Sequence, residues 1–184
     1  TQNWDMAEQA NGWMYVANNY GLLETDGCHW NLYGISNSTA VRATTIDKDG
    51  SIYVGGTDEF GVFYSDSLGG LKYQQLSTNI PERYRQFGEV WRLQIDNKKL
   101  YVQTRHYIFV YTKDNIEVLD PGAIIYESLV WEGNLYVATS RDIFVQSGGR
   151  LHALRGAEAL HNSVVCGLVP YGKEGMLIAT DFLG

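Results

Sequence analysis

The sequence has 184 residues, of which 45% are apolar and 19% are charged. This balance is typical of a globular chain and excludes an intrinsically disordered one. Its net charge of −7 argues against a nucleic-acid-binding surface, because contacts with phosphates need clustered lysine and arginine. No stretch of the sequence approaches the roughly 20 apolar residues of a membrane-spanning helix.

A short strand-forming phrase recurs five times along the chain: an aliphatic residue, then tyrosine and valine or close substitutes. It begins at Met14, Ile52, Leu100, Leu135 and Met176. Its second residue recurs at intervals of 38, 48, 35 and 41 residues. A period of about 40 residues is that of a four-stranded propeller blade.

Each period also contains the other strands of such a blade. Ahead of the phrase lies a turn, and Asn-Gly at 11–12 and Asp-Gly at 49–50 favour the left-handed conformations of a tight hairpin. We expect a strand before this turn, as at 41–46, 90–95 and 164–169. A third strand is expected at 21–23, 61–64, 108–111 and 143–145. A fourth is expected at 30–33, 71–76, 116–119 and 151–154.

The sequence therefore predicts an all-β fold, a partial β-propeller with about four complete four-stranded blades and the start of a fifth. The blades are expected at residues 1–36, 37–80, 81–122, 123–160 and, incomplete, 161–184. A stack of hairpins in a sandwich or barrel is the alternative, but it would not place the same phrase at the same point of each period. Because the fifth period stops after two strands, we expect the chain to be a fragment of one larger propeller domain.

The second blade resembles a known repeat. Its segment 46–56 reads Ile-Asp-Lys-Asp-Gly-Ser-Ile-Tyr-Val-Gly-Gly and is followed by Gly-Val-Phe at 61–63. This is similar to the two-component regulator propeller repeat, and the segment 11–24 resembles the first blade of such sensors. Blade three departs from the pattern with Asp-Asn-Lys-Lys at 96–99, and blade four shortens the turn at 131–134.

The resemblance implies a periplasmic ligand-sensing region of a Bacteroidetes-type two-component or LuxR-type regulator. A glycan or similar small molecule is the class of ligand that it suggests. It also implies a homodimer in the full-length protein, and a membrane helix and an output domain downstream, either a histidine kinase or a helix-turn-helix. No nucleic acid is expected to bind this region.

The residues themselves carry no recognisable catalytic motif. The histidines at 29, 106, 152 and 161 lack the spacing of a metal site, and neither a Gly-x-Ser-x-Gly elbow nor a Walker-type phosphate loop occurs. We predict no catalytic residue, metal or cofactor for this fragment. A propeller-fold lyase or hydrolase and a passive interaction scaffold remain as alternatives.

The turns between the second and third strands form the first set of ligand-binding candidates. In a propeller these turns share one face with the connections between blades, so their polar and aromatic residues form a ring suited to a sugar. The candidates are Asn19, Tyr20, Asp58, Glu59, Arg105, His106 and Arg141. For the acidic pair Asp58 and Glu59, a solvated turn is the favoured interpretation.

The longest connection between blades, 79–89, supplies the other candidates, Arg83, Tyr84 and Arg85. Long loops on rigid scaffolds often carry recognition, and two arginines can together bind an acidic sugar. The alternative is a surface loop that packs over its neighbouring blade. Trp91 and Arg92, at the start of the next inner strand, can face the central channel, but the core is the more frequent place for a tryptophan there and is the place we expect for Trp91. Cys28 and Cys166 are expected to be free or buried, because blades one and five are well separated in an arc.

Overall fold

The computed structural model describes residues 2–67, 69–161, 163–172 and 175–181. Its strands form four antiparallel sheets of four strands and one of two strands, each in sequence order. These sheets confirm the predicted all-β fold, with four complete blades and the first two strands of a fifth. Among the described residues, no helix is long and apolar enough to cross a membrane.

The strand bounds of the first two blades follow the predicted pattern. The first blade consists of β1 (Asn3–Glu8), β2 (Met14–Asn18), β3 (Gly21–Thr25) and β4 (Trp30–Tyr33). The second consists of β5 (Ala43–Ile46), β6 (Ile52–Gly55), β7 (Phe60–Ser65) and β8 (Leu71–Gln75). The long connection that follows contains two 3₁₀ turns, η1 (Ser77–Asn79) and η2 (Glu82–Tyr84).

The remaining blades repeat this arrangement. The third consists of β9 (Arg92–Asp96), β10 (Lys99–Gln103), β11 (Ile108–Thr112) and β12 (Asn115–Leu119). The fourth consists of β13 (Ile125–Trp131), β14 (Asn134–Thr139), β15 (Ile143–Ser147) and β16 (Arg150–Ala153). After η3 (Glu158–Leu160), the fifth begins with β17 (Val165–Tyr171) and β18 (Gly175–Thr180).

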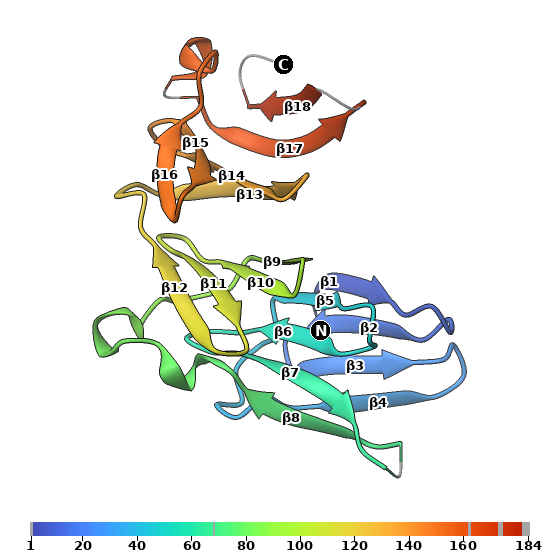
Figure 1. The fold of residues 1–184 in the computed structure, drawn as a ribbon. Helices are drawn as coiled ribbons and strands as arrows, with labels where there is room; N and C mark the ends of the chain where they lie inside the picture. The colour runs from blue at the N-terminus through green and yellow to red at the C-terminus, as the bar shows by residue number, and fades with distance from the viewer. Residues whose placement is uncertain (1, 68, 162, 173–174, 182–184) are drawn as a thin grey trace.

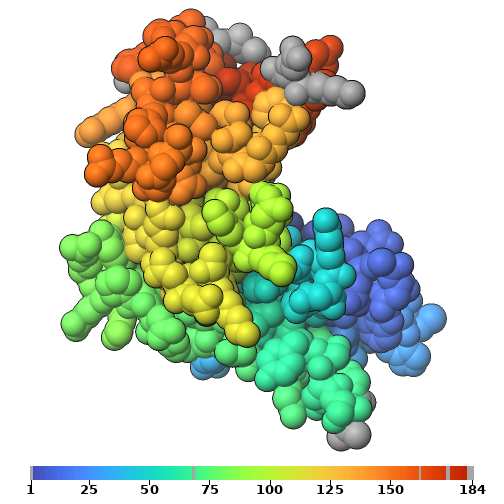
Figure 2. All heavy atoms as spheres, in the orientation of Figure 1, coloured from blue at the N-terminus to red at the C-terminus, as the bar shows by residue number. Residues whose placement is uncertain are grey.

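The blades follow one another along an arc (Figure 1). The first strand of each blade contacts the first strand of the next, from β1 through β5, β9 and β13 to β17. These first strands therefore lie on the inner side of the arc. The space-filling view shows the same curvature, with a hollow between the blue first blade and the orange fourth blade (Figure 2).

The core lies between successive blades. Leu22, Ile52 and Phe63 pack together between the first and second. Between the second and third, the rings of Phe60 and Phe109 lie 6.0 Å apart. Fully burying one such side chain stabilises the fold by roughly 1.5–3 kcal/mol relative to leaving it exposed.

The inner strands β5 and β9 begin two residues later than predicted, and hydrogen bonding explains the difference. The amide of Val41 donates to the carbonyl of Asn18 at 3.0 Å, and that of Val90 donates to the carbonyl of Gly56 at 3.0 Å. Both valines are fully buried. These residues thus join each blade to the preceding one before the strand pairing of the new blade starts.

Candidate functional site

One face of the arc collects the turns between second and third strands and the connections between blades. An up-and-down sheet places both at the same end of its strands, so these segments lie together. We call this surface the turn face; it consists of the turns 19–20, 56–59, 104–107 and 140–142 and the connections 34–42, 76–91, 120–124, 154–161 and 163–164.

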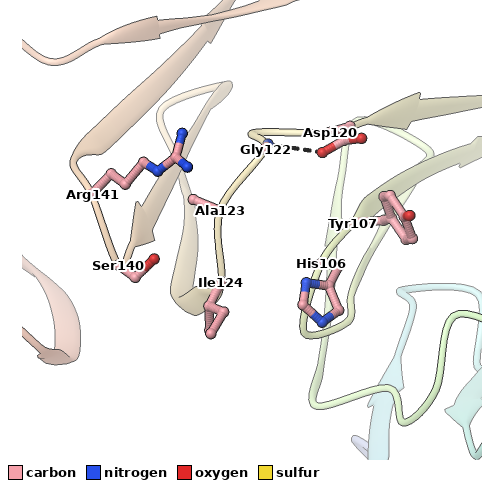
Figure 3. A pocket seen from close by; sticks show the side chains of 8 residues that line it. All are labelled: His106, Tyr107, Asp120, Gly122, Ala123, Ile124, Ser140 and Arg141. Carbon is pink, nitrogen blue, oxygen red and sulfur yellow. Dashed lines mark hydrogen bonds between the residues drawn. The ribbon is translucent and has the colours of Figure 1, made fainter.

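A pocket of about 350 Å³ opens on the turn face between the third and fourth blades. Two of the predicted residues, His106 and Arg141, line it from different blades, together with Tyr107, Asp120 and the 122–124 segment. Figure 3 shows His106 and Arg141 on opposite sides of that segment, with the Asp120 carboxylate accepting the backbone N–H of Gly122 at 2.8 Å. The structure therefore brings together two residues that lie 35 positions apart in the sequence.

A buried threonine at the end of the second strand positions each of the two turns. The hydroxyl of Thr104 accepts the backbone N–H groups of His106 at 3.3 Å and Tyr107 at 3.0 Å. In the next blade, the hydroxyl of Thr139 accepts the backbone N–H of Arg141 at 3.2 Å. Sequence reasoning missed both threonines, although Thr recurs directly before the polar turn residues at 105–106 and 140–142.

The long connection extends the pocket rim toward the second blade. The ring of Tyr84 meets that of Tyr107 edge-on, with centroids 5.1 Å apart, and the Arg83 guanidinium lies 4.6 Å from the centre of the Tyr84 ring. The His106 ring lies beside Tyr107 at 6.4 Å. Arg83, Tyr84 and His106 thus form one continuous strip, and the connection does pack over its neighbouring blade.

Two of the predicted arginines have other surroundings. Arg85 donates its Nε–H to the carbonyl of Ile80 at 3.2 Å and lines a separate hollow of about 280 Å³ with Asp58 and Phe87. It therefore does not line the His106–Arg141 pocket. Arg105 is exposed, and its carbonyl accepts the backbone N–H of Ile125 at 2.8 Å, which ties its turn to the fourth blade.

The solvated-turn interpretation of the acidic pair is wrong for Glu59. Its side chain is only 1% exposed, and its two carboxylate oxygens accept the backbone N–H groups of Ser36 and Asn37, each at 3.0 Å. Asp58 is exposed, but its carboxylate accepts the backbone N–H of Gly88 at 2.6 Å. Both carboxylates hold connections between blades in place.

The first-blade candidates do not line the His106–Arg141 pocket. Asn19 accepts the indole N–H of Trp4 at 2.8 Å, and Tyr20 is 69% exposed. Beside Trp4, the guanidinium of Arg42 lies 3.7 Å from the centre of that indole and 5.8 Å from the centre of Trp91.

Trp91 is 46% exposed, so its predicted place in the core is wrong. The residue directly precedes β9, the first strand of the third blade, and its indole is open to solvent. Nearby, burial raises the pKa of the Glu127 carboxyl, and the Arg92 guanidinium 2.8 Å away opposes that shift. Cys28 and Cys166 are both free and exposed.

No protein-family model and no curated protein matches the sequence. Among solved structures, the extracellular domain of a putative one-component system from B. thetaiotaomicron is similar, with a TM-score of 0.72 and 18% identity over 97% of this chain and 25% of that one. A catalytically inactive virginiamycin B lyase from Staphylococcus aureus, solved with quinupristin, has a TM-score of 0.72 and 15% identity over 97% of this chain and 63% of that one.

The WD40 propeller domain of Doa1 is also similar, with a TM-score of 0.71 and 14% identity over 95% of this chain and 60% of that one. At these identities the likeness is one of fold, and it supports the β-propeller architecture. The similarity to the B. thetaiotaomicron extracellular domain agrees, in fold, with the resemblance to sensor propellers seen in the sequence. This chain thus spans only a quarter of the length of the solved B. thetaiotaomicron chain.

Proposed function

We propose that this chain is the ligand-sensing propeller region of a periplasmic two-component-type regulator of signal transduction and transcription, and that it binds a glycan or similar small molecule on the turn face. The observation that carries the proposal is the pocket shared by His106 and Arg141. Its volume of about 350 Å³ lies within the range of small-ligand sites, roughly 300–1,000 Å³.

The chemistry of the pocket rim suits a sugar. Arg141 and His106 supply N–H groups for hydroxyl or carboxylate oxygens, and Asp120 supplies acceptor oxygens for hydroxyl groups. Tyr84 and Tyr107 add aromatic surface beside them. A guanidinium can bind a carboxylate through two hydrogen bonds, so an acidic sugar would use Arg141 most fully.

Signalling requires that the ligand distinguish two arrangements of the protein, because equal affinity for both shifts no population. The pocket is formed by two blades, so a bound ligand would favour one placement of the third blade against the fourth. In the full-length protein we propose a homodimer whose relative protomer placement carries this bias, through a downstream membrane helix, to a kinase or helix-turn-helix output.

Calorimetric titration of the chain with a panel of neutral and acidic oligosaccharides tests the proposal. We expect binding of at least one of them, weakened about tenfold by Arg141→Ala or His106→Ala, the loss that follows removal of one charged hydrogen bond. The matched controls, Arg150→Ala and His152→Ala, alter exposed residues of β16. Equal weakening by the controls, or binding of no saccharide, would contradict the assignment.

The second candidate function is that of a propeller-fold carbohydrate-active lyase or hydrolase; the fold likeness to virginiamycin B lyase supports the lyase part, and the carbohydrate substrate is part of the proposal. In that case the saccharide bound at the pocket would be converted, and chromatography of the incubation mixture would reveal a product. Recovery of the saccharide unchanged after prolonged incubation with the full-length protein would rule this function out for that substrate.

A further inference from the structure

A second hollow lies away from the turn face. It has a volume of about 770 Å³ and lies between the hairpin β5–β6 of the second blade and the hairpin β9–β10 of the third. We call it the hairpin groove; its side chains include Lys48, Lys98, Lys99, Lys113, Tyr53 and Tyr111. Because these hairpins lie at the opposite end of the strands from the turn face, the groove is separate from the His106–Arg141 pocket.

The groove lining carries four lysines and three aspartates, a formal charge of +1 on a chain whose net charge is negative. The chain has a net charge of −7 and six lysines in all, and four of the six line this one hollow. Among the residues that the structure describes, none of these four ammonium groups has a carboxylate oxygen within 4.0 Å. All four are therefore available to an anionic ligand.

The carboxylates of the groove are already engaged by its own turns. Asp47 accepts the backbone N–H of the following residue at 2.7 Å, and Asp49 accepts that of Ser51 at 2.9 Å. Asp96 accepts the side-chain amide of the following residue at 2.9 Å. These carboxylates shape the two hairpin turns, whereas no side-chain hydrogen bond of the four lysines occurs within the described part of the chain.

One of the lysines, Lys98, has a left-handed backbone conformation that is unfavourable for a residue with a side chain. The two-residue turn of the β9–β10 hairpin has Asn97 and Lys98 in the left-handed region, with φ of 46° and 63°. In the matching turn of the β13–β14 hairpin the second position is Gly133, with φ of 76°. Glycine adopts this conformation freely and lysine does not. A strained residue at the edge of a cavity points to a role for its side chain.

Two half-buried tyrosines provide ring surface among the ammonium groups. Burial, with the nearby carboxylates of Asp49 and Asp47, raises the pKa of Tyr53 above its usual value of 10.0. Burial likewise raises the pKa of Tyr111, with a contribution from Asp114. Both phenols are therefore protonated at neutral pH and can donate hydrogen bonds to an anion or a hydroxyl group.

We infer that the hairpin groove is a second binding site, whose ligand is an anionic saccharide. Its carboxylate or sulfate ester meets the lysine ammonium groups, and its ring lies against Tyr53 and Tyr111. The volume of about 770 Å³ suits a ligand of two or three sugar rings. The inference rests on the groove alone and stands whether or not the turn face binds a glycan.

Calorimetric titrations at low salt separate the contribution of the anionic group to binding from that of the sugar rings. The ligands are trigalacturonate, a sulfated chondroitin disaccharide, neutral maltotriose and inorganic sulfate. We expect one or both anionic saccharides to bind at least about tenfold more tightly than maltotriose and than sulfate, and to bind more weakly as salt rises. The carboxylate and sulfate-ester arms identify which anion the groove prefers. Equal binding of maltotriose, or of inorganic sulfate, would overturn the inference.

Lys98→Gly is the decisive variant, because one substitution removes the ammonium group and also relieves the strain of the left-handed backbone conformation. We expect a melting temperature at or above that of the unchanged chain, together with severalfold weaker binding of the anionic saccharide. Lys72→Ala removes the same charge from β8, outside the groove, and should leave the affinity unchanged. Unchanged affinity in Lys98→Gly, or an equal loss in Lys72→Ala, would show that the groove is not the site.

Discussion

Thr104 and Thr139 occupy equivalent places in neighbouring blades, and their hydroxyls make matching hydrogen bonds. The Thr104 hydroxyl donates to the carbonyl of Tyr107 at 3.0 Å, and the Thr139 hydroxyl donates to that of Asp142 at 2.8 Å. Each also accepts backbone N–H groups of its own turn. The repetition gives both turns one backbone shape, which presents His106 and Arg141 to a common pocket.

Replacing Thr139 by valine should lower the free energy of unfolding by about 1–3 kcal/mol, because the backbone N–H groups of Arg141 and Asp142 lose their acceptor. The side chain is 2% exposed, so water does not replace the hydroxyl. Urea unfolding measures the change. Thr112→Val is the control, since its hydroxyl bonds the carbonyl of Asn115 at an exposed site. If both variants unfold at the same urea concentration, Thr139 does not hold the turn.

Glu59→Ala should be more damaging. Two backbone N–H groups, those of Ser36 and Asn37, then lose a charged acceptor inside the protein. We expect a loss of about 2–4 kcal/mol in the free energy of unfolding, given roughly 1.5–3 kcal/mol for a hydrogen bond to a charged group. Glu82→Ala, at an exposed position in η2, removes the same charge and should change little. A Glu59 variant as stable as the Glu82 variant would refute a structural role for the buried carboxylate.

Gly55→Ala should destabilise the contact between the second and third blades. A Cβ atom at this position would clash with Cγ1 of Val90, which is fully buried. We expect a loss of about 1–3 kcal/mol from this overpacking, measured by thermal or urea unfolding. Gly34→Ala, where an added Cβ has no atom within 4 Å, is the matched control. The double variant Gly55→Ala with Val90→Ala should lose less free energy of unfolding than the two single variants lose in sum, because the smaller side chain at position 90 relieves the clash.

Stability should fall as the pH rises from about 10 to about 12. Burial, with the charge and hydrogen bond of Glu24, raises the pKa of Tyr15 to about 12, and the same causes raise the pKa of Tyr33 to about 12. The unfolded chain loses these protons near pH 10, so between the two values the folded state binds more protons and loses stability with rising pH. Urea midpoints at pH 9, 10 and 11 measure the slope.

The double variant Tyr15→Phe with Tyr33→Phe should flatten that slope. Glu24→Gln keeps both phenols but removes the carboxylate that accepts their hydrogen bonds at 3.2 and 2.9 Å, and it should give an intermediate slope. A slope that is the same in all three proteins would mean that other groups control the alkaline transition.

The four-stranded blades could be predicted because strand-forming and turn-forming residues act over short stretches of the sequence. The recurring phrase became β2, β6, β10, β14 and β18, and the Asn-Gly and Asp-Gly turns ahead of it closed the hairpins. Strand alternation and turn preference act over a few residues, so a repeat of about 40 residues is legible in the sequence.

The sites were decided by tertiary contacts between blades. Glu59 is buried because a connection 22 and 23 residues away presents two backbone N–H groups to it. Trp91 is exposed although Val90, directly before it, is fully buried between two blades. His106 and Arg141 line one pocket, and Lys48 and Lys98 line one groove, only because neighbouring blades pack against each other. Sequence by itself determined the blades, whereas the packing of one blade against the next decided which side chains share a pocket, since that packing depends on pairs of residues far apart in the chain.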